Sequence, residues 1–192
     1  MAEAPIVAVL DACVLAGSVP RHLLLSFAEA GLFAPVWSDR ILRETERAIP
    51  KTFANAAAPP EDAAAHAGTV CQLMVEVFPC AIPETQIAPE RLPDLPDPDD
   101  RHVVETALAS SAGYIVTDNL KDFPKSALQP LGITAISADR FLAQLAEDQP
   151  KETRACCNQL IARVHAPDFD FQAFTDRLKT LGFRRFRQIV SS

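Results

Sequence analysis

A chain of 192 residues, of which 48% are hydrophobic and 22% charged, has the length and composition of a soluble globular protein with one α/β domain and a smaller appendage. No stretch approaches the roughly 20 uninterrupted apolar residues of a membrane span. The net charge of −7 argues against a protein that coats nucleic acid non-specifically, because that affinity comes mainly from neutralising phosphates. The N-terminus has no basic segment of the kind that begins a secretory signal, so we expect a cytoplasmic protein.

The cysteines and histidines do not form a metal-binding pattern. The five cysteines are an odd set without a C-x-x-C pair, which fits reduced thiols in a reducing compartment. The four histidines are scattered and make no H-E-x-x-H motif; they are His22, His66, His102 and His165. Zinc chemistry is therefore disfavoured.

The first part of the chain alternates strand and helix patterns. Residues 5–10, PIVAVL, form a short β-branched run without alternation, which is typical of a buried strand in a parallel sheet. Residues 20–31 have Pro near the start and Gly at the end, as a helix does. The apolar segment 32–37 predicts a second strand, and Ser38 is placed to cap a helix that starts at residue 39.

The middle of the chain predicts two helices separated by a loop. Residues 61–78 predict an amphipathic helix, and its expected core-facing stripe is Val70, Leu73, Met74 and Val77. Five prolines mark residues 83–100 as a loop. The next helix starts behind acidic caps and is expected to end at Gly113; its apolar face is Val103, Val104, Ala107 and Leu108.

The last part of the chain predicts two more strands and then only helices. Residues 114–117 and 132–137 are the strands, with turn chemistry between them and a helix over 138–148. Alternation of strands and helices predicts βαβ units and a mostly parallel sheet with helices on both faces. Pro150 marks a boundary, so we expect a domain over 1–148 and a helical extension over 149–192, made of two helices.

Acidic residues fall where the predicted strands end. Asp11 follows the first strand, and Asp118 follows the strand over 114–117, with Asn119 and Asp122 in the same turn. Ligands of open parallel sheets bind at this carboxyl edge. Asp100 starts a helix and reaches the same edge only if the loop before it folds back.

Each of these acids also has a structural interpretation that stays open. Asp11 and Asp100 are suited to helix caps, and Asp118, Asn119 and Asp122 are turn formers. Glu44 can pair with Arg40 and Arg47 on a solvated helix face. The placement of several acids at one edge nevertheless indicates a bound cation, because several carboxylates cannot all ionise together at neutral pH without one. A donor set of oxygens alone suits Mg²⁺ or Mn²⁺, which would activate water and neutralise the charge of a phosphodiester.

Over residues 5–145 the sequence resembles the PIN-domain ribonucleases, in particular the VapC-type toxins of bacterial toxin–antitoxin pairs. Four segments carry the resemblance: VAVLDACVL, WSDRILRETERAI, DPDDRHVVETALASSAGYIVTDNLKDFP and GITAIS. The resemblance implies a flavodoxin-like, three-layer α/β/α sandwich and Mg²⁺- or Mn²⁺-dependent endoribonuclease activity. It also implies inhibition by a small antitoxin, and relatives of this type often dimerise.

The resemblance assigns the first acid of the site to Asp11, the glutamate to Glu44 and the third acid to Asp100. Where many relatives carry the fourth acid, this chain has Asn119, so either Asp118 or Asp122 completes the set, or Asn119 holds a water. Asp118 is expected to contribute more, because it follows a strand directly and the sheet positions it.

Other protein classes fit these residues less well. A phosphotransferase of the haloacid dehalogenase type needs a second Asp where Cys13 stands, and a receiver domain needs differently spaced acids. A non-catalytic PIN-like module that binds RNA or a protein remains the alternative, because Asn119 replaces an acid.

The most basic stretch of this acidic chain is residues 177–187, which contains no acid and carries Arg184, Arg185 and Arg187. Three interpretations remain open for it. Its apolar residues can dock the tail while the arginines stay solvated, the arginines can clamp RNA phosphates, or they can bind an acidic antitoxin segment.

Overall fold

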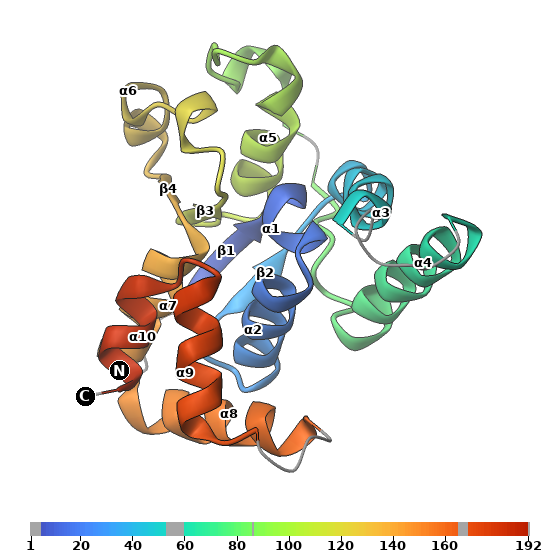
Figure 1. Ribbon diagram of the computed structural model, residues 1–192. Coiled ribbons are helices and arrows are strands. Elements are labelled where there is room, and N and C mark those ends of the chain that lie inside the picture. The colour runs from blue at the N-terminus through green and yellow to red at the C-terminus, as the bar shows by residue number, and fades with distance from the viewer. Residues whose placement is uncertain (1–4, 53–59, 86, 165–168, 192) are drawn as a thin grey trace.

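A computed structural model describes residues 5–52, 60–85, 87–164 and 169–191; His165 and much of the linker after residue 52 lie outside this range. Its centre is a sheet of four parallel strands in the order β2-β1-β3-β4 (Figure 1). The strands are β1 (Val7–Leu10), β2 (Ala34–Val36), β3 (Tyr114–Val116) and β4 (Thr134–Ile136). Ala8, Val9 and Leu10 of β1 are fully buried, as a central strand covered on both faces requires. The predicted parallel α/β architecture is confirmed.

The helices cover both faces of this sheet. They are α1 (Ala12–Ala16), α2 (Ser18–Glu29), α3 (Asp39–Thr52), α4 (Pro60–Val77), α5 (Arg101–Ala109), α6 (Lys125–Leu128), α7 (Ala138–Asp148), α8 (Pro150–Arg163), α9 (Phe171–Thr180) and α10 (Arg184–Val190). Short 3₁₀ turns are η1 (Pro89–Arg91), η2 (Pro98–Asp100), η3 (Leu120–Asp122) and η4 (Gln129–Leu131). Right-handed crossovers place α5 and α6 on one face, and α2 and α7, which contact each other, on the opposite face.

Helix starts agree with the sequence prediction where a side chain caps them. Ser38 Oγ accepts a hydrogen bond from the Ile41 backbone N–H at the start of α3. The short helix α1 was not predicted, because five residues are too few to show a helical period. Buried Arg21 donates hydrogen bonds to the carbonyls of Leu15 and Ala16, which lets α1 end directly before α2.

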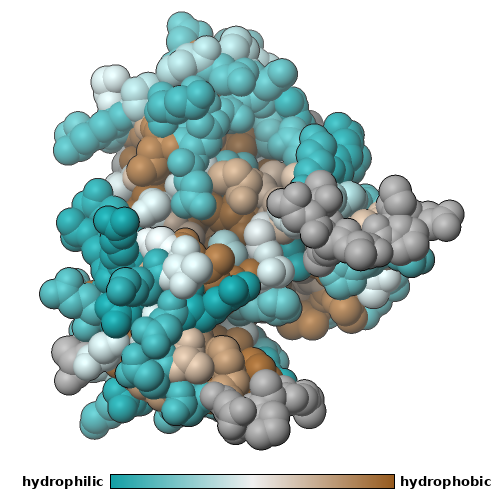
Figure 2. Space-filling model, in the orientation of Figure 1, coloured by the Kyte–Doolittle hydropathy of each residue, from teal (hydrophilic) through white to brown (hydrophobic). Residues whose placement is uncertain are grey.

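The predicted core-facing stripe of α4 is right at Met74 and Val70, which pack against the core, and wrong at Leu73 and Val77. Leu73 and Val77 are 52% and 55% exposed, whereas Met74 is buried. The buried face of α4 consists of Ala63, Ala67, Cys71 and Met74. These small side chains pack against α3 rather than against the sheet, so bulk hydrophobicity does not identify the packed face. The exposed residues form an apolar patch at the end of α4 (Figure 2).

Two other helix ends differ from the prediction. Helix α5 ends at Ala109 rather than at Gly113, and Ser111 takes the positive φ that glycine was expected to supply. The C-terminal region holds three helices among the described residues instead of two. Gly182, with φ of 86°, separates α9 from α10.

The C-terminal helices pack on the same core as the sheet. Phe186 of α10 is fully buried and meets the Phe27 ring of α2 edge-on, with 5.6 Å between ring centroids. The carboxylate of Asp139 in α7 accepts hydrogen bonds from the backbone N–H groups of Arg185 and Phe186. The α/β fold with a helical C-terminal extension is therefore confirmed, and a domain boundary at residue 148 stays a prediction. In the part of the chain that the structure describes, no helix has both the length and the apolar composition needed to cross a bilayer.

Candidate active site

Asp11 stands at the carboxyl edge of the sheet, directly after β1. Its backbone N–H donates to the Val116 carbonyl, and its position is that of the α1 N-cap, yet its side chain makes no cap hydrogen bond. Instead, Oδ2 accepts a 2.7 Å hydrogen bond from Thr117 Oγ1. Asp11 is only 8% exposed, and Thr117 is fully buried at the end of β3. The carboxylate is thus oriented by a neighbouring strand, which a simple helix cap would not need.

Cys13 belongs to the same hydrogen-bond group. Its thiol lies 3.1 Å from Asp11 Oδ2, as a donor, and 3.2 Å from Thr117 Oγ1. Desolvation and the nearby Asp11 carboxylate raise the pKa of Cys13 to about 12. The sulfur therefore stays protonated at neutral pH in the metal-free protein.

Asp100 connects the carboxylates electrostatically. The turn η2 folds back over the sheet edge and places Asp100 at the start of α5. Desolvation raises the pKa of Asp100 to about 6, and carboxylates around it add to the rise: Asp11, Asp97, Asp122 and Glu44. Its Oδ2 atom is buried without a hydrogen-bond partner. A buried oxygen without a donor is costly, so this atom is poised for a ligand or a proton.

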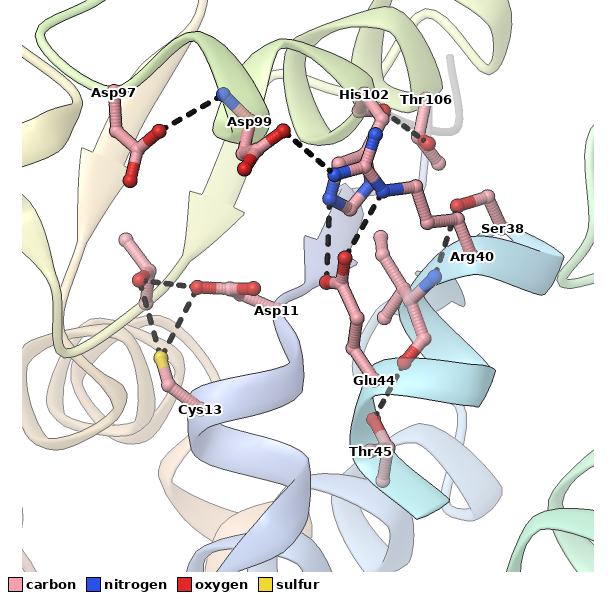
Figure 3. A network of polar contacts seen from close by, with 12 residues as sticks. Asp11, Cys13, Ser38, Arg40, Glu44, Thr45, Asp97, Asp99, His102 and Thr106 are labelled. Carbon is pink, nitrogen blue, oxygen red and sulfur yellow. Dashed lines mark hydrogen bonds and ion pairs between the residues drawn. The ribbon is translucent and has the colours of Figure 1, made fainter. Parts of the chain in front are cut away.

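Glu44 faces the same space from α3 (Figure 3). Its Oε1 accepts a 3.0 Å hydrogen bond from Arg40 Nε, and its Oε2 lies 3.2 Å from His102 Nε2. Arg40 Nη2 also lies 3.4 Å from Asp99 Oδ1. Because Asp99 is highly exposed, this ion pair adds little stability. The expected Arg40 pair exists, but the contact with His102 of α5 makes Glu44 part of a tertiary network rather than a solvated helix-face pair.

His102 is largely buried, with 9% of its side chain exposed. Burial lowers the pKa of His102, and the Glu44 carboxylate opposes that change. Its Nδ1 atom is buried without a partner. A neutral imidazole that donates from Nε2 to Glu44 is consistent with this environment.

The two candidates for the fourth acid point to different neighbours. Asp122 contributes to the raised pKa of Asp100 and accepts a hydrogen bond from the Asn119 side-chain amide. Desolvation raises the pKa of Asp118, while the Ala138 backbone N–H at the start of α7 lowers it. Asp122 thus lies in the field of Asp100, whereas Asp118 contacts the start of α7 and also lies in the field of Asp11, and the order of importance of the two acids stays a prediction.

The carboxylates do not form a ready-made cage. Among the described residues, no group of three or more His, Cys, Asp or Glu side chains could hold a metal ion as it stands. Like charges at one edge repel, so metal-free carboxylates are expected to stand apart. The donor chemistry itself, together with the unpartnered Asp100 Oδ2, fits a hard divalent cation.

Sequence reasoning missed Thr117 and the role of His102. The sequence did contain a signal for Thr117, because this residue ends the strand just before Asp118, and a hydroxyl at that position can reach Asp11. The contact between His102 and Glu44 had none, because it joins two helices far apart in the chain. Of the tail arginines, Arg184 and Arg185 are exposed, whereas Arg187 is half-buried and its Nε is buried without a partner.

Comparison with known proteins agrees with this architecture. Residues 7–121, more than half of the chain, match the sequence model of the PIN domain. A stretch of 79 residues is 35% identical to "Putative ribonuclease VapC50" of Mycobacterium tuberculosis (strain ATCC 25618 / H37Rv), and covers 41% of this chain and 47% of that protein. The match thus spans about half the length of that relative, and no solved structure matches. The matched range includes Asp11, Glu44 and Asp100 with the strands that place them, and the chain belongs to the PIN domain family.

Proposed function

We propose that this protein is a Mg²⁺- or Mn²⁺-dependent endoribonuclease and the toxin of a type II toxin–antitoxin pair. The observation that carries the proposal is Asp100, whose buried Oδ2 lacks a partner while four further carboxylates raise its pKa. A divalent cation would satisfy that oxygen and offset the mutual repulsion. RNA as substrate is supported by the similarity to a protein named as a ribonuclease.

The proposed ligands are the carboxylates of Asp11, Asp100 and Asp122, with Asp118 at the rim. A bound Mg²⁺ or Mn²⁺ would activate water and neutralise charge on the scissile phosphodiester. Thr117 holds the Asp11 carboxylate in one orientation by its hydrogen bond. Asn119 does the same for Asp122. These contacts support a site in which small shifts of carboxylates, rather than refolding of the edge, are enough for binding.

Glu44 is the proposed proton acceptor. It is half-buried, and it faces the carboxylates from α3 (Figure 3). Arg40 and His102 each hold one of its oxygens, so that the side chain cannot swing into solvent. A positioned carboxylate can remove the proton of an attacking water.

A non-catalytic PIN-like module that binds RNA or a protein is the second candidate. It is favoured by the lack, within the described chain, of three side chains placed to hold an ion. The Asn119 amide also occupies one oxygen of Asp122. Such a module would bind without cleaving.

RNA cleavage separates the two candidates. A fluorescent single-stranded RNA is incubated with wild-type protein in Mn²⁺ and in excess EDTA, and with Asp11→Asn. Asp148→Asn, an exposed acid at the far end of α7, is the matched control. The proposal expects cleavage by wild type and the control in Mn²⁺ only, and none by Asp11→Asn. Cleavage in EDTA, or equal cleavage by Asp11→Asn, contradicts it.

The antitoxin partner and a homodimer belong to the same proposal. Co-expression with the neighbouring gene, followed by size-exclusion chromatography, tests both. A small protein that co-elutes and suppresses cleavage supports the toxin role, and nuclease activity without such a protein limits the function to RNA hydrolysis.

A further inference from the structure

The basic end of the chain lies at the same sheet edge as the carboxylates. Asp139, in the first turn of α7, binds the N–H groups of Arg185 and Phe186 at 3.2 and 2.9 Å and so anchors the start of α10. The burial of Phe186 and Val190 holds the rest of α10 in place. Arg184 and Arg185 are therefore presented by a fixed helix at the carboxyl edge (Figure 1).

Asp118 connects this end of α10 to the candidate active site. The charges of Asp11 and Asp139 both raise the pKa of Asp118. Its carboxylate accepts a hydrogen bond from the Ala138 backbone N–H, which lowers that pKa. Asp118 thus lies within electrostatic range of both Asp11 and the Asp139 that anchors α10.

A polar groove of about 730 Å³ lies between α7 and α10 and beside β4. Arg140 of α7 and Arg185 of α10 line it from opposite sides, with Gln144 and Gln188 further along. Its acid, Glu147, stands about two helical turns beyond Arg140, or roughly 10 Å. The groove is therefore cationic at the end next to the carboxylates and acidic at the far end.

The two arginines of this groove have no direct ion-pair partner among the described residues. Within the described residues, the guanidinium groups of Arg140 and Arg185 form no hydrogen bond or ion pair, and both residues are exposed. Hydrophilic residues cover the side of the molecule where α7 and α10 lie (Figure 2). Ile136, Ala143 and Ile189 also line the groove, but its lining is more polar than apolar. This groove offers guanidinium and amide groups, which suit phosphate and nucleotide oxygens.

We propose that the groove between α7 and α10, through Arg140 and Arg185, binds backbone phosphates of the RNA strand that flanks the cleaved bond. The proposal rests on the proposed ribonuclease function for the identity of the ligand. It places the C-terminal extension in substrate binding, while the carboxylates perform the chemistry.

The test measures binding of a fluorescent single-stranded RNA by anisotropy across a salt series, in EDTA, with the full chain. The variants are Arg140→Gln/Arg185→Gln and the control Lys151→Gln, an exposed cation beyond the far end of α7. Each lost phosphate contact lowers the slope of log affinity against log salt by about 0.7, so the double variant is expected to lower it by about 1.4. Lys151→Gln should keep the wild-type slope. Circular dichroism checks that each variant is folded.

Each outcome has one consequence. If the folded double variant keeps the wild-type slope of log affinity against log salt, the proposal of RNA binding in the groove is overturned. If an antitoxin from the neighbouring gene also no longer co-purifies with that variant, the arginines bind a protein partner instead. A reduced slope with no cleavage by wild type in Mn²⁺ supports the groove and contradicts the nuclease. No salt-dependent binding by wild type overturns the groove, whereas cleavage in Mn²⁺ decides the nuclease separately.

Discussion

Thr117 Oγ1 donates a 2.7 Å hydrogen bond to Asp11 Oδ2, and both residues are buried where neighbouring parallel strands end. The bond crosses from β3 to β1, so the orientation of the first acid depends on the strand that also leads to Asp118. We expect Thr117→Val, which keeps the shape and removes the hydroxyl, to lower the free energy of unfolding by about 1 to 3 kcal/mol. Mn²⁺ affinity should fall about 10- to 100-fold, as for other groups that orient a metal ligand.

Urea unfolding and calorimetric Mn²⁺ titration measure these two effects. Thr134→Val, the same change at an exposed position of β4, is the control. Wild-type stability and Mn²⁺ affinity in Thr117→Val would show that the hydroxyl does not position Asp11.

Asp100 should make the metal-free protein less stable as the pH rises. Its pKa of about 6 in the folded protein lies above the ordinary value of 3.8, so the folded state binds more protons than the unfolded state between these values. The stability that Asp100 contributes is therefore complete below about pH 4 and is lost as the pH rises through 6. Asp100→Asn should remove this dependence, which appears as the difference between the two proteins in urea unfolding at pH 4 to 8. A constant difference over this range would contradict the shift.

Asp122→Ala is expected to reduce Mn²⁺-dependent cleavage more than Asp118→Ala. The charge of Asp122 acts on Asp100, whereas Asp118 accepts a hydrogen bond from the Ala138 N–H at the start of α7. Cleavage rates at saturating and limiting Mn²⁺ distinguish a lost ligand from a lost rim contact. A larger loss with Asp118→Ala would restore the order expected from sequence.

His102 is expected to act as a positioning residue for Glu44. His102→Leu removes the donor at 3.2 Å and should lower kcat about 10-fold or more with little change in KM, because RNA binding does not involve the buried imidazole. His102→Gln can restore a donor near the same place and should recover part of kcat. Equal loss in both variants at unchanged stability would show that the donor is not what matters.

Removal of α10 should destabilise the fold, and not merely remove charge. Phe186 is fully buried against Phe27, so Phe186→Ala is expected to cost about 3 to 5 kcal/mol of unfolding free energy. Leu181→Ala, at a 39% exposed position next to Gly182, is the control and should cost much less. Truncation after Gly182 removes Phe186 as well, so point substitutions are the better probe of the arginines. Unfolding in urea measures both variants, and similar costs would show that α10 is only loosely attached.

Local sequence patterns alone determined several of the secondary-structure elements of this protein. The β-branched runs at 5–10 and 114–117, the Ser38 cap and the helix over 138–148 were predictable because strand burial, capping and helical period act within a few residues. The position of Asp11 at a strand end, and hence at the carboxyl edge, followed from the same pattern. The segments that carry the resemblance added Glu44 and Asp100, and the parallel fold that both imply is the one observed.

Only the tertiary structure decided which side chains meet. The return of the proline-rich loop brings Asp100 near Asp11 and Glu44, Asp118 contacts the start of α7, and the packing of α4 on α3 buries small residues instead of Leu73 and Val77. The anchoring of α10 by Asp139 likewise joins residues distant in the chain. Such contacts depend on how whole elements pack, and the burial and charge that surround a side chain arise only when those elements come together, so no local pattern could specify them.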